Sequence, residues 1–167
     1  IYRELHRIAG NFYRWTKGVD TSPHWRIQKN YVLFQRFLPD NEFDTRITVI
    51  GDRAFGFRRM TRKSDFRASG SGIIDYDIGK IDLRCVDIAF RVSQQLGFQS
   101  MAYDFLFTEG NEPQFCEISY TYLSRAIWKC PGYWDTKFNW HDGHYWPEYL
   151  HLVDVLRLPD LKAIDQL

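Results

Sequence analysis

Hydrophobic residues recur at helical spacing in separate parts of the chain. The clearest case is residues 81–96, where the apolar positions of one face are Cys85, Ala89, Val92 and Leu96. Gly97 follows directly and is a typical helix stop. The same spacing predicts an amphipathic helix over residues 2–15, and we also expect a closing helix over 147–156.

Other segments have the character of β-strands. Residues 31–37 (YVLFQRF) form an apolar, β-prone run that predicts a buried strand. Residues 44–50 alternate between apolar and polar side chains, and the pair Gly51–Asp52 predicts a turn into a return strand at 54–57. Residues 100–107 and 113–119 predict two further strands joined by a short turn.

The remaining segments have the composition of loops. Residues 16–30 read as a connector and residues 64–79, rich in glycine and serine, as a loop, while the chain from 120 onward is aromatic and irregular. The order of elements predicts an α+β fold with a mostly antiparallel β-sheet and flanking helices. We divide the chain into a helix and connector (1–30), a core (31–125) and an aromatic extension that ends in a helix (126–167).

Composition and charge narrow the class of protein. The chain has 167 residues, of which 44% are hydrophobic and 17% aromatic, which suits one domain or a large fragment of one. The net charge is only +1, so neither nucleic acid nor an anionic membrane is expected as a partner. No stretch approaches the ~20 apolar residues of a membrane span.

The cysteines and the first residue bear on location and completeness. Three cysteines without a C-x-x-C motif do not support a disulfide framework, so we expect reduced thiols in a cytoplasmic protein. The histidines of the HDGH segment at 141–144 match no zinc-ligand spacing together with these cysteines. Because the chain starts at Ile1, we expect further residues upstream.

Positive charge is concentrated in one part of the chain. Six basic residues fall within fifteen positions: Arg53, Arg58, Arg59, Arg62, Lys63 and Arg67. Guanidinium groups bind phosphate with paired hydrogen bonds, so this cluster predicts an anionic ligand, most simply phosphate.

Two carboxylates stand in the neighbouring strands predicted at 100–107 and 113–119. If these strands pair about their turn, positions whose numbers sum to about 220 face one another, which brings Asp104 close to Glu117. Ser119 points the same way as Glu117 because strand side chains alternate. Such hard oxygen ligands suit Mg²⁺. The equal alternative is that Glu117 is a solvated strand residue and Asp104 a local hydrogen-bonding group.

Three segments in order resemble the ATP-grasp superfamily, and the ribosomal-protein glutamate ligase and glutathione synthetase-like branch in particular. Residues 31–60 (YVLFQRFLPDNEFDTRITVIGDRAFGFRRM) resemble its hinge strand, D-x-R strand and return strand. Residues 64–72 (SDFRASGSG) are similar to its D-F-R-S-N segment. The pair LGFQSMAYDFLF and FCEIS is similar to its aspartate strand and its E-x-N strand.

The resemblance implies sets of residues that contact ATP and its magnesium (or manganese) ions. The adenine edge would meet the hinge residues Gln35, Arg36 and Phe37. Asp44 would bind the ribose hydroxyls, and the phosphates would meet Arg67 and Ser69. The metal ligands would be Asp104, Glu117 and Ser119. Both serines stand where the family has asparagine.

The resemblance also implies a fold and a reaction. The chain would be the C-terminal subdomain of an ATP-grasp ligase that joins a small-molecule or peptide carboxylate to an amine or other nucleophile through an acyl phosphate. Arg67 and Arg59 would be the catalytic arginines; Arg58 would face away from Arg59. The family's glycine-rich loop has no match in residues 1–30, so we expect this chain alone to bind ATP weakly and catalyse nothing.

Two other readings stay open at this point. The chain is alternatively a non-catalytic nucleotide-binding or regulatory module on the same fold, or an α+β interaction domain without a nucleotide site. The sequence also leaves open whether the protein forms an oligomer, and it does not name the carboxylate or the nucleophile.

Overall fold

The structure is a computed structural model in which the chain divides into two compact units, Ile1–Arg36 and Phe37–Leu167. It describes residues 34–62 and 70–157, together with Gly10, Phe12, Tyr13, Thr16, Lys17, Val32 and Ala68. In the first unit, the helical residues among these are Gly10, Phe12, Tyr13 and Thr16. The rest of the helix expected at 2–15 lies outside the described residues.

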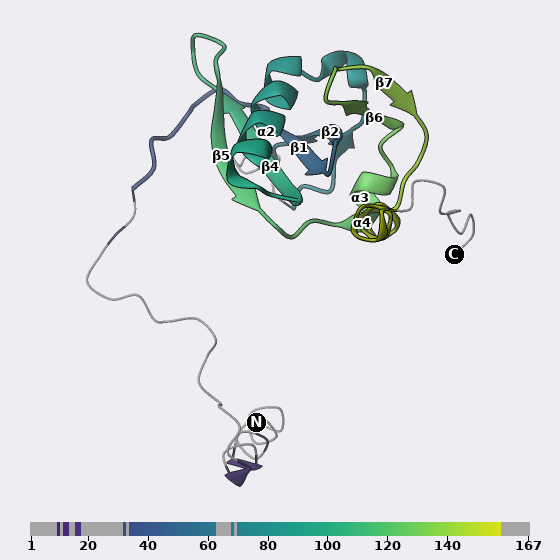
Figure 1. Ribbon diagram of the computed structural model, residues 1–167. Coiled ribbons are helices and arrows are strands. Elements are labelled where there is room, and N and C mark those ends of the chain that lie inside the picture. The colour runs from purple at the N-terminus through teal and green to yellow at the C-terminus, as the bar shows by residue number, and fades with distance from the viewer. Residues whose placement is uncertain are drawn as a thin grey trace. The chain divides into compact units, whose positions relative to one another are not determined.

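The second unit is built on one antiparallel sheet (Figure 1). Its strands are β1 (Phe43–Ile50), β2 (Arg53–Met60), β3 (Ile74–Asp75), β4 (Ser100–Phe107), β5 (Pro113–Ser119), β6 (Gly132–Asp135) and β7 (Trp140–Asp142). The spatial order is β5-β4-β1-β2-β6-β7, with β3 paired to β2, and every strand pair in the described part of the chain is antiparallel. The α+β class with a mostly antiparallel sheet is therefore confirmed.

The helical elements of this unit are a 3-10 turn η1 (Ile78–Lys80) and the helices α2 (Leu83–Leu96), α3 (Ser124–Trp128) and α4 (Pro147–Leu156). Asp82 caps the start of α2 by accepting a hydrogen bond from the backbone of Arg84. Gly97 ends this helix at φ 68°, a left-handed conformation that glycine adopts without steric cost. The predicted bounds of α2 and α4 are confirmed within about two residues.

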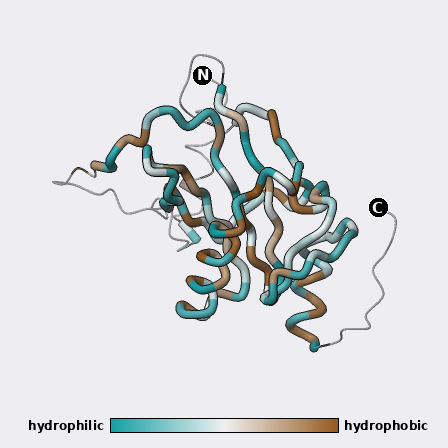
Figure 2. The backbone as a smooth tube through the Cα atoms, turned by 90° about the horizontal axis from the view of Figure 1, so that it is seen from above, coloured by the Kyte–Doolittle hydropathy of each residue, from teal (hydrophilic) through white to brown (hydrophobic). Residues whose placement is uncertain are grey.

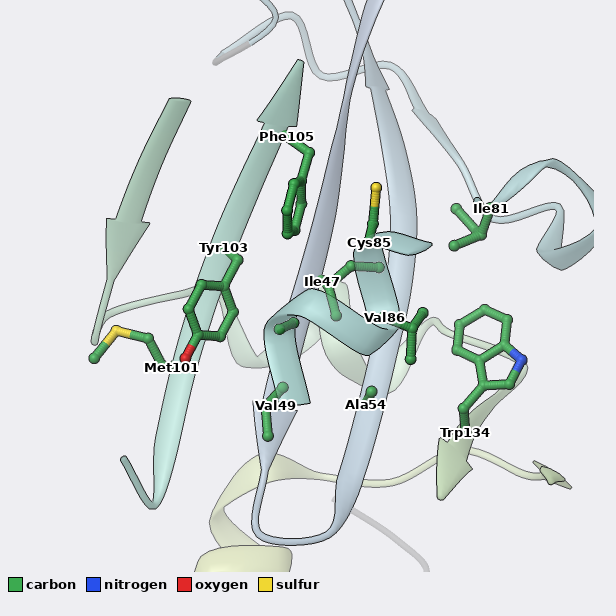
Figure 3. Packing of buried hydrophobic residues seen from close by; sticks show 11 residues of the cluster. Ile47, Val49, Ala54, Ile81, Cys85, Val86, Met101, Tyr103, Phe105 and Trp134 are labelled. Atoms are coloured by element: carbon green, nitrogen blue, oxygen red, sulfur yellow. The ribbon is translucent and has the colours of Figure 1, made fainter. Parts of the chain in front are cut away.

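Each face of the sheet packs against different helices. The face that carries Ile47, Val49 and Tyr103 is covered by α2, whose Cys85 and Val86 point into it (Figure 3). The opposite face carries a second core that joins the sheet to α3 and α4: Ile50, Phe55, Phe57, Ile127, Cys130 and Leu150. Hydrophobic and hydrophilic positions are mixed along the helices and strands (Figure 2). Residues 47–50 of β1 are all buried, as expected for a central strand whose two faces are both covered.

One strand prediction was wrong. Val32 and residues 34–37 belong to no strand, and they are exposed, with Phe34 showing 87% of its surface. The physical reason is that β-propensity describes how well side chains suit a pleated sheet, whereas a strand also needs a partner for its backbone groups. Within the described residues, none of the strand pairs includes this segment.

Two regions are more regular than predicted. The expected loop at 64–79 contains β3 and the first two residues of η1. The region after residue 120, expected to be irregular before its closing helix, contains α3 and the β6–β7 hairpin. In this hairpin Trp134 and Trp140 are cross-strand partners with ring centroids 4.7 Å apart. The aromatic residues of this region were expected to be irregular, but some of them form a hairpin that belongs to the sheet. Aromatic cross-strand pairs stabilise neighbouring strands.

A side chain extends the ladder between β1 and β4. The amide of Asn41 accepts a hydrogen bond from the backbone nitrogen of Phe107 (2.8 Å) and donates one to its carbonyl oxygen (3.0 Å). These are the two bonds that a paired backbone would make. The chain that enters β1 is thus attached to the end of β4 two residues before its own strand begins.

Candidate functional site

Charged side chains gather on one face of the sheet, beside the core that carries α3 and α4. Asp44 and Arg46 lie two positions apart on β1 and therefore point to the same face. Asp44 pairs with Arg59 of β2, and Arg46 pairs with Asp104 of β4, so that four charges from three strands lie together.

Two arginine–carboxylate pairs with two hydrogen bonds each form the centre of this cluster. Nε and Nη2 of Arg46 donate to Oδ1 and Oδ2 of Asp104, at 2.6 and 2.7 Å. Nε and Nη2 of Arg59 donate to Oδ1 and Oδ2 of Asp44, at 2.8 and 2.6 Å. A fifth bond, 2.6 Å from Nη2 of Arg59 to Oδ2 of Asp104, joins the two pairs. We call these four residues the charge cluster.

The charge cluster is largely removed from solvent. Asp44 and Asp104 expose only 6% and 3% of their surface. Burial raises the pKa of Asp44, and the hydrogen bond from Arg59 opposes that shift. Burial alone would lower the pKa of Arg59, but the hydrogen bonds and negative charges of Asp44 and Asp104 outweigh it and raise that pKa. The two positive charges therefore balance two carboxylates in a poorly hydrated place.

Glu117 extends the charge cluster to the edge of the sheet. It is the cross-strand partner of Asp104 and is exposed on β5, an edge strand of the sheet. From the turn inward, the pairs up to Phe105 and Phe115 sum to 220, but Asp104 and Glu117 sum to 221. Cys116 is the extra residue of a β-bulge between them.

The bulge corrects the register expected from the sequence. An unbroken ladder would set Cys116 opposite Asp104 and would turn Glu117 to the face covered by α2, because a shift of one residue reverses every side chain. With the bulge, Glu117 shares the face of Asp104. The Cys116 thiol lies near the same charges: its pKa is raised by partial burial and by the carboxylates of Asp104, Asp44 and Glu117.

Ser119 lies on the same face as Glu117, but its hydroxyl is engaged locally. Its Oγ donates to the carbonyl oxygen of Thr121 (3.0 Å) and accepts from the backbone nitrogen of that residue (3.2 Å). The two hydroxyls are also 3.1 Å apart. The hydroxyl would have to leave this turn to serve as a metal ligand.

The other predicted site residues fall in different places. Gln35, Arg36 and Phe37 are exposed and lie outside helices and strands. Arg67 and Ser69 lie outside the described residues.

Arg58, next to Arg59 on β2, points to the opposite face, as alternation requires. It donates to Asp75 of β3 at 2.6 Å, and its guanidinium lies 4.4 Å from the centre of the Phe43 ring. Of these two neighbouring arginines, Arg59 belongs to the charge cluster and Arg58 does not.

Two residues had no role assigned from the sequence: Arg46, which belongs to the charge cluster, and Cys116, which lies near it. A signal for Arg46 was present, because a residue two positions after Asp44 in a strand shares its face. Cys116 carried no comparable signal, since a bulge is set by pairing with another strand.

Within the described part of the chain, no group of three or more histidine, cysteine, aspartate or glutamate side chains is placed to hold a metal ion. A cavity of about 390 Å³ lies elsewhere, beside Phe43, Thr45 and Phe107 on the face of the sheet that packs against α2. It does not open on the charge cluster, so we base the candidate site on the contacts of the charged residues.

Two further observations concern the class of protein rather than the chemistry of the site. Among the described residues, no helix combines the length and the apolar composition that crossing a membrane demands. No family model matches the chain, and no curated protein matches it. The function is therefore argued from the charge cluster and its surroundings.

Proposed function

We propose that the chain is the nucleotide- and magnesium-binding part of an ATP-grasp ligase that activates a carboxylate as an acyl phosphate for attack by an amine or other nucleophile. The observation that carries the proposal is the pairing of Asp104 with Glu117 across β4 and β5, beside the arginines of the charge cluster. Carboxylates next to guanidinium groups are the combination needed to hold a metal–phosphate complex.

The residues present fit a magnesium ion in chemical type, and the two carboxylates share one face of the sheet. Mg²⁺ takes one or two protein carboxylates and fills its other positions with water and phosphate oxygens. Asp104 and Glu117 supply two carboxylates on one face, so they suffice even though no third acidic or histidine ligand accompanies them in the described residues. Ser119 would join only through its hydroxyl or a bridging water.

Each side chain has a distinct task in this proposal. Asp104 and Glu117 would hold the cation, which would neutralise charge on the nucleotide phosphates. Arg59 donates to the transferring phosphoryl group, where a preorganised positive charge lowers the barrier. Arg46 keeps Asp104 in its rotamer through two hydrogen bonds.

A second candidate is a nucleotide-binding or regulatory module without catalysis. It is favoured by one observation, the engagement of the Ser119 hydroxyl with Thr121 rather than with the carboxylates. A site with only one firm metal position would hold a nucleotide but would position its phosphates less well for transfer.

Calorimetric titration with ATP in MgCl₂ and in EDTA tests nucleotide binding. We expect magnesium-dependent binding that weakens at least ~10-fold in Asp104→Asn and in Glu117→Gln, about 1.4 kcal/mol. Asp75→Asn is the matched control, because it removes an acidic group from the opposite face of the sheet. Folded Asp104 and Glu117 variants with unchanged binding would overturn the metal assignment.

Release of ADP by the full-length protein, on adding a carboxylate and an amine, separates the two candidates. A ligase releases ADP only when the carboxylate is present, whereas a binding module releases none under any of these conditions. The measurement is a coupled assay over a panel of small carboxylates and peptides.

A further inference from the structure

A single nitrogen atom connects the two carboxylates of the charge cluster. Nη2 of Arg59 lies 2.6 Å from Oδ2 of Asp44 and 2.6 Å from Oδ2 of Asp104. Protein oxygens surround Ca²⁺ at about 2.3–2.6 Å and Mg²⁺ at about 2.0–2.1 Å. At Oδ2 of Asp104, Nη2 of Arg59 thus occupies a position close to the one that a cation coordinated by this oxygen would take.

The arginines also compete for the oxygen that a metal ion would use. Oδ2 of Asp104 accepts from Nη2 of both Arg46 and Arg59, at 2.7 and 2.6 Å. A divalent ion at this oxygen would displace at least one donor or lie against two positive charges. The formal charges of the two arginines and two aspartates of the charge cluster cancel. Glu117 adds one negative charge beside them.

We propose that Arg59 is a gating residue that closes Asp104 to divalent cations until the phosphates of a nucleotide draw its guanidinium away, so that metal binds together with the nucleotide. This inference rests on the proposed function and names how that same site is regulated. One hydrogen bond is exchanged: the Nη2 proton that points to Asp104 turns to a phosphate oxygen. The pairing with Asp44 through Nε is retained.

The number of bonds identifies Arg59, rather than Arg46, as the residue that moves. Arg46 makes two hydrogen bonds to Asp104, and losing it would leave a buried carboxylate largely uncompensated. Arg59 makes only one bond to Asp104 and keeps a partner, Asp44, when that bond breaks. The separable contact is therefore the bond that joins the two pairs.

Binding of Mn²⁺ alone, followed by electron paramagnetic resonance of the free ion, tests the gate without any enzymatic activity. We expect the native chain to take up little Mn²⁺ alone and to take it up in the presence of ADP. Arg59→Gln should bind Mn²⁺ without nucleotide at least ~10-fold more tightly than the native chain, and adding Asp104→Asn should abolish the gain. Arg59→Lys keeps the charge and should restore closure.

Arg58→Gln is the matched control, since it removes the same charge one residue away but on the opposite face. Its Mn²⁺ binding should equal that of the native chain. If Arg59→Gln does not fold, Arg59→Gln combined with Asp44→Asn removes the pair together, leaves no unpaired carboxylate at position 44, and should show the same gain.

The outcomes separate this inference from the proposed function. A folded Arg59→Gln protein that binds Mn²⁺ no better than the native chain overturns the gate, as does a native chain that binds ADP but takes up Mn²⁺ equally well with and without it. Failure of every protein to bind ATP would overturn the ligase proposal only, because the comparison of Mn²⁺ binding between Arg59→Gln and the native chain needs no nucleotide.

Discussion

Glu117 lies directly across from Asp104 even though the hairpin turn sets Cys116 in that position. Two backbone bonds of the turn fix the register of the first pairs: Thr108 donates to the carbonyl oxygen of Glu112 and accepts from the nitrogen of Asn111. The extra residue at 116 then moves every later residue of β5 by one place. The side-chain composition of the site therefore depends on an irregularity in the ladder.

Two single-residue deletions in β5 test this relationship. Removing Cys116 or Phe115 gives strands of equal length in which a regular ladder again sets Glu117 opposite Asp104. Deleting Phe115 also removes a ring that lies 4.9 Å from the Phe105 ring. We expect the Phe115 deletion to be less stable than the Cys116 deletion by about 1–2 kcal/mol, measured by urea unfolding.

Nuclear Overhauser contacts between the backbones of residues 104 and 117 provide the structural check, and both deletions should retain them. Contacts of Glu117 with Tyr103 instead, or equal stability of the two deletions, would contradict the assignment of Cys116 as the inserted residue.

A buried hydroxyl pair links α2 to the sheet and gives a second prediction. The hydroxyls of Ser93 and Tyr103 are 2.5 Å apart, and both residues are buried. Tyr103→Phe leaves the serine hydroxyl without this partner and should cost about 1–2 kcal/mol of unfolding free energy. In a double-mutant cycle with Ser93→Ala, the two changes together should cost less than their sum. Simple additivity would show that the pair contributes nothing.

The buried thiols predict a loss of stability at alkaline pH. Burial raises the pKa of Cys85 to about 12 and that of Cys130 to about 12, against an ordinary value of 9.0. The folded state therefore holds these protons more tightly than the unfolded state. The stabilisation is complete below pH 9 and is lost as the pH rises towards 12, with a slope of up to about 1.4 kcal/mol per pH unit for each thiol.

Urea unfolding at pH 8 and pH 10.5 measures this loss. The matched control is the Cys85→Ala, Cys130→Ala double variant, which starts less stable because it loses packing but should decline less steeply with pH. Identical slopes in the two proteins would mean that other groups account for the alkaline transition.

Local patterns predicted the elements that local signals define. The helix α2 follows from its apolar face and from Gly97, and the strands β4 and β5 follow from apolar runs bounded by a turn. The segment 31–37 carried an equally strong apolar pattern, but its described residues form no strand. Hydrophobic pattern alone cannot say whether a neighbouring strand is available.

The sequence predicted which residues of the candidate site share a face better than it predicted which of them form hydrogen bonds. Alternation placed Arg59 and Arg58 on opposite faces, and the structure has them so. The bond between Arg59 and Asp104 joins positions 45 residues apart on strands that are not adjacent. Such a contact depends on the strand order, which the hydrophobic pattern of the chain does not encode.

The attachment of Asn41 to Phe107 has a mechanical consequence. Because both backbone groups of Phe107 are held by this side chain, the polypeptide is fastened to the sheet before β1 starts. A pull on the upstream chain would load the outer hairpin of β4 and β5 as well as the central strand. Asp40, directly before this attachment, has a φ of 62° and so departs from extended backbone.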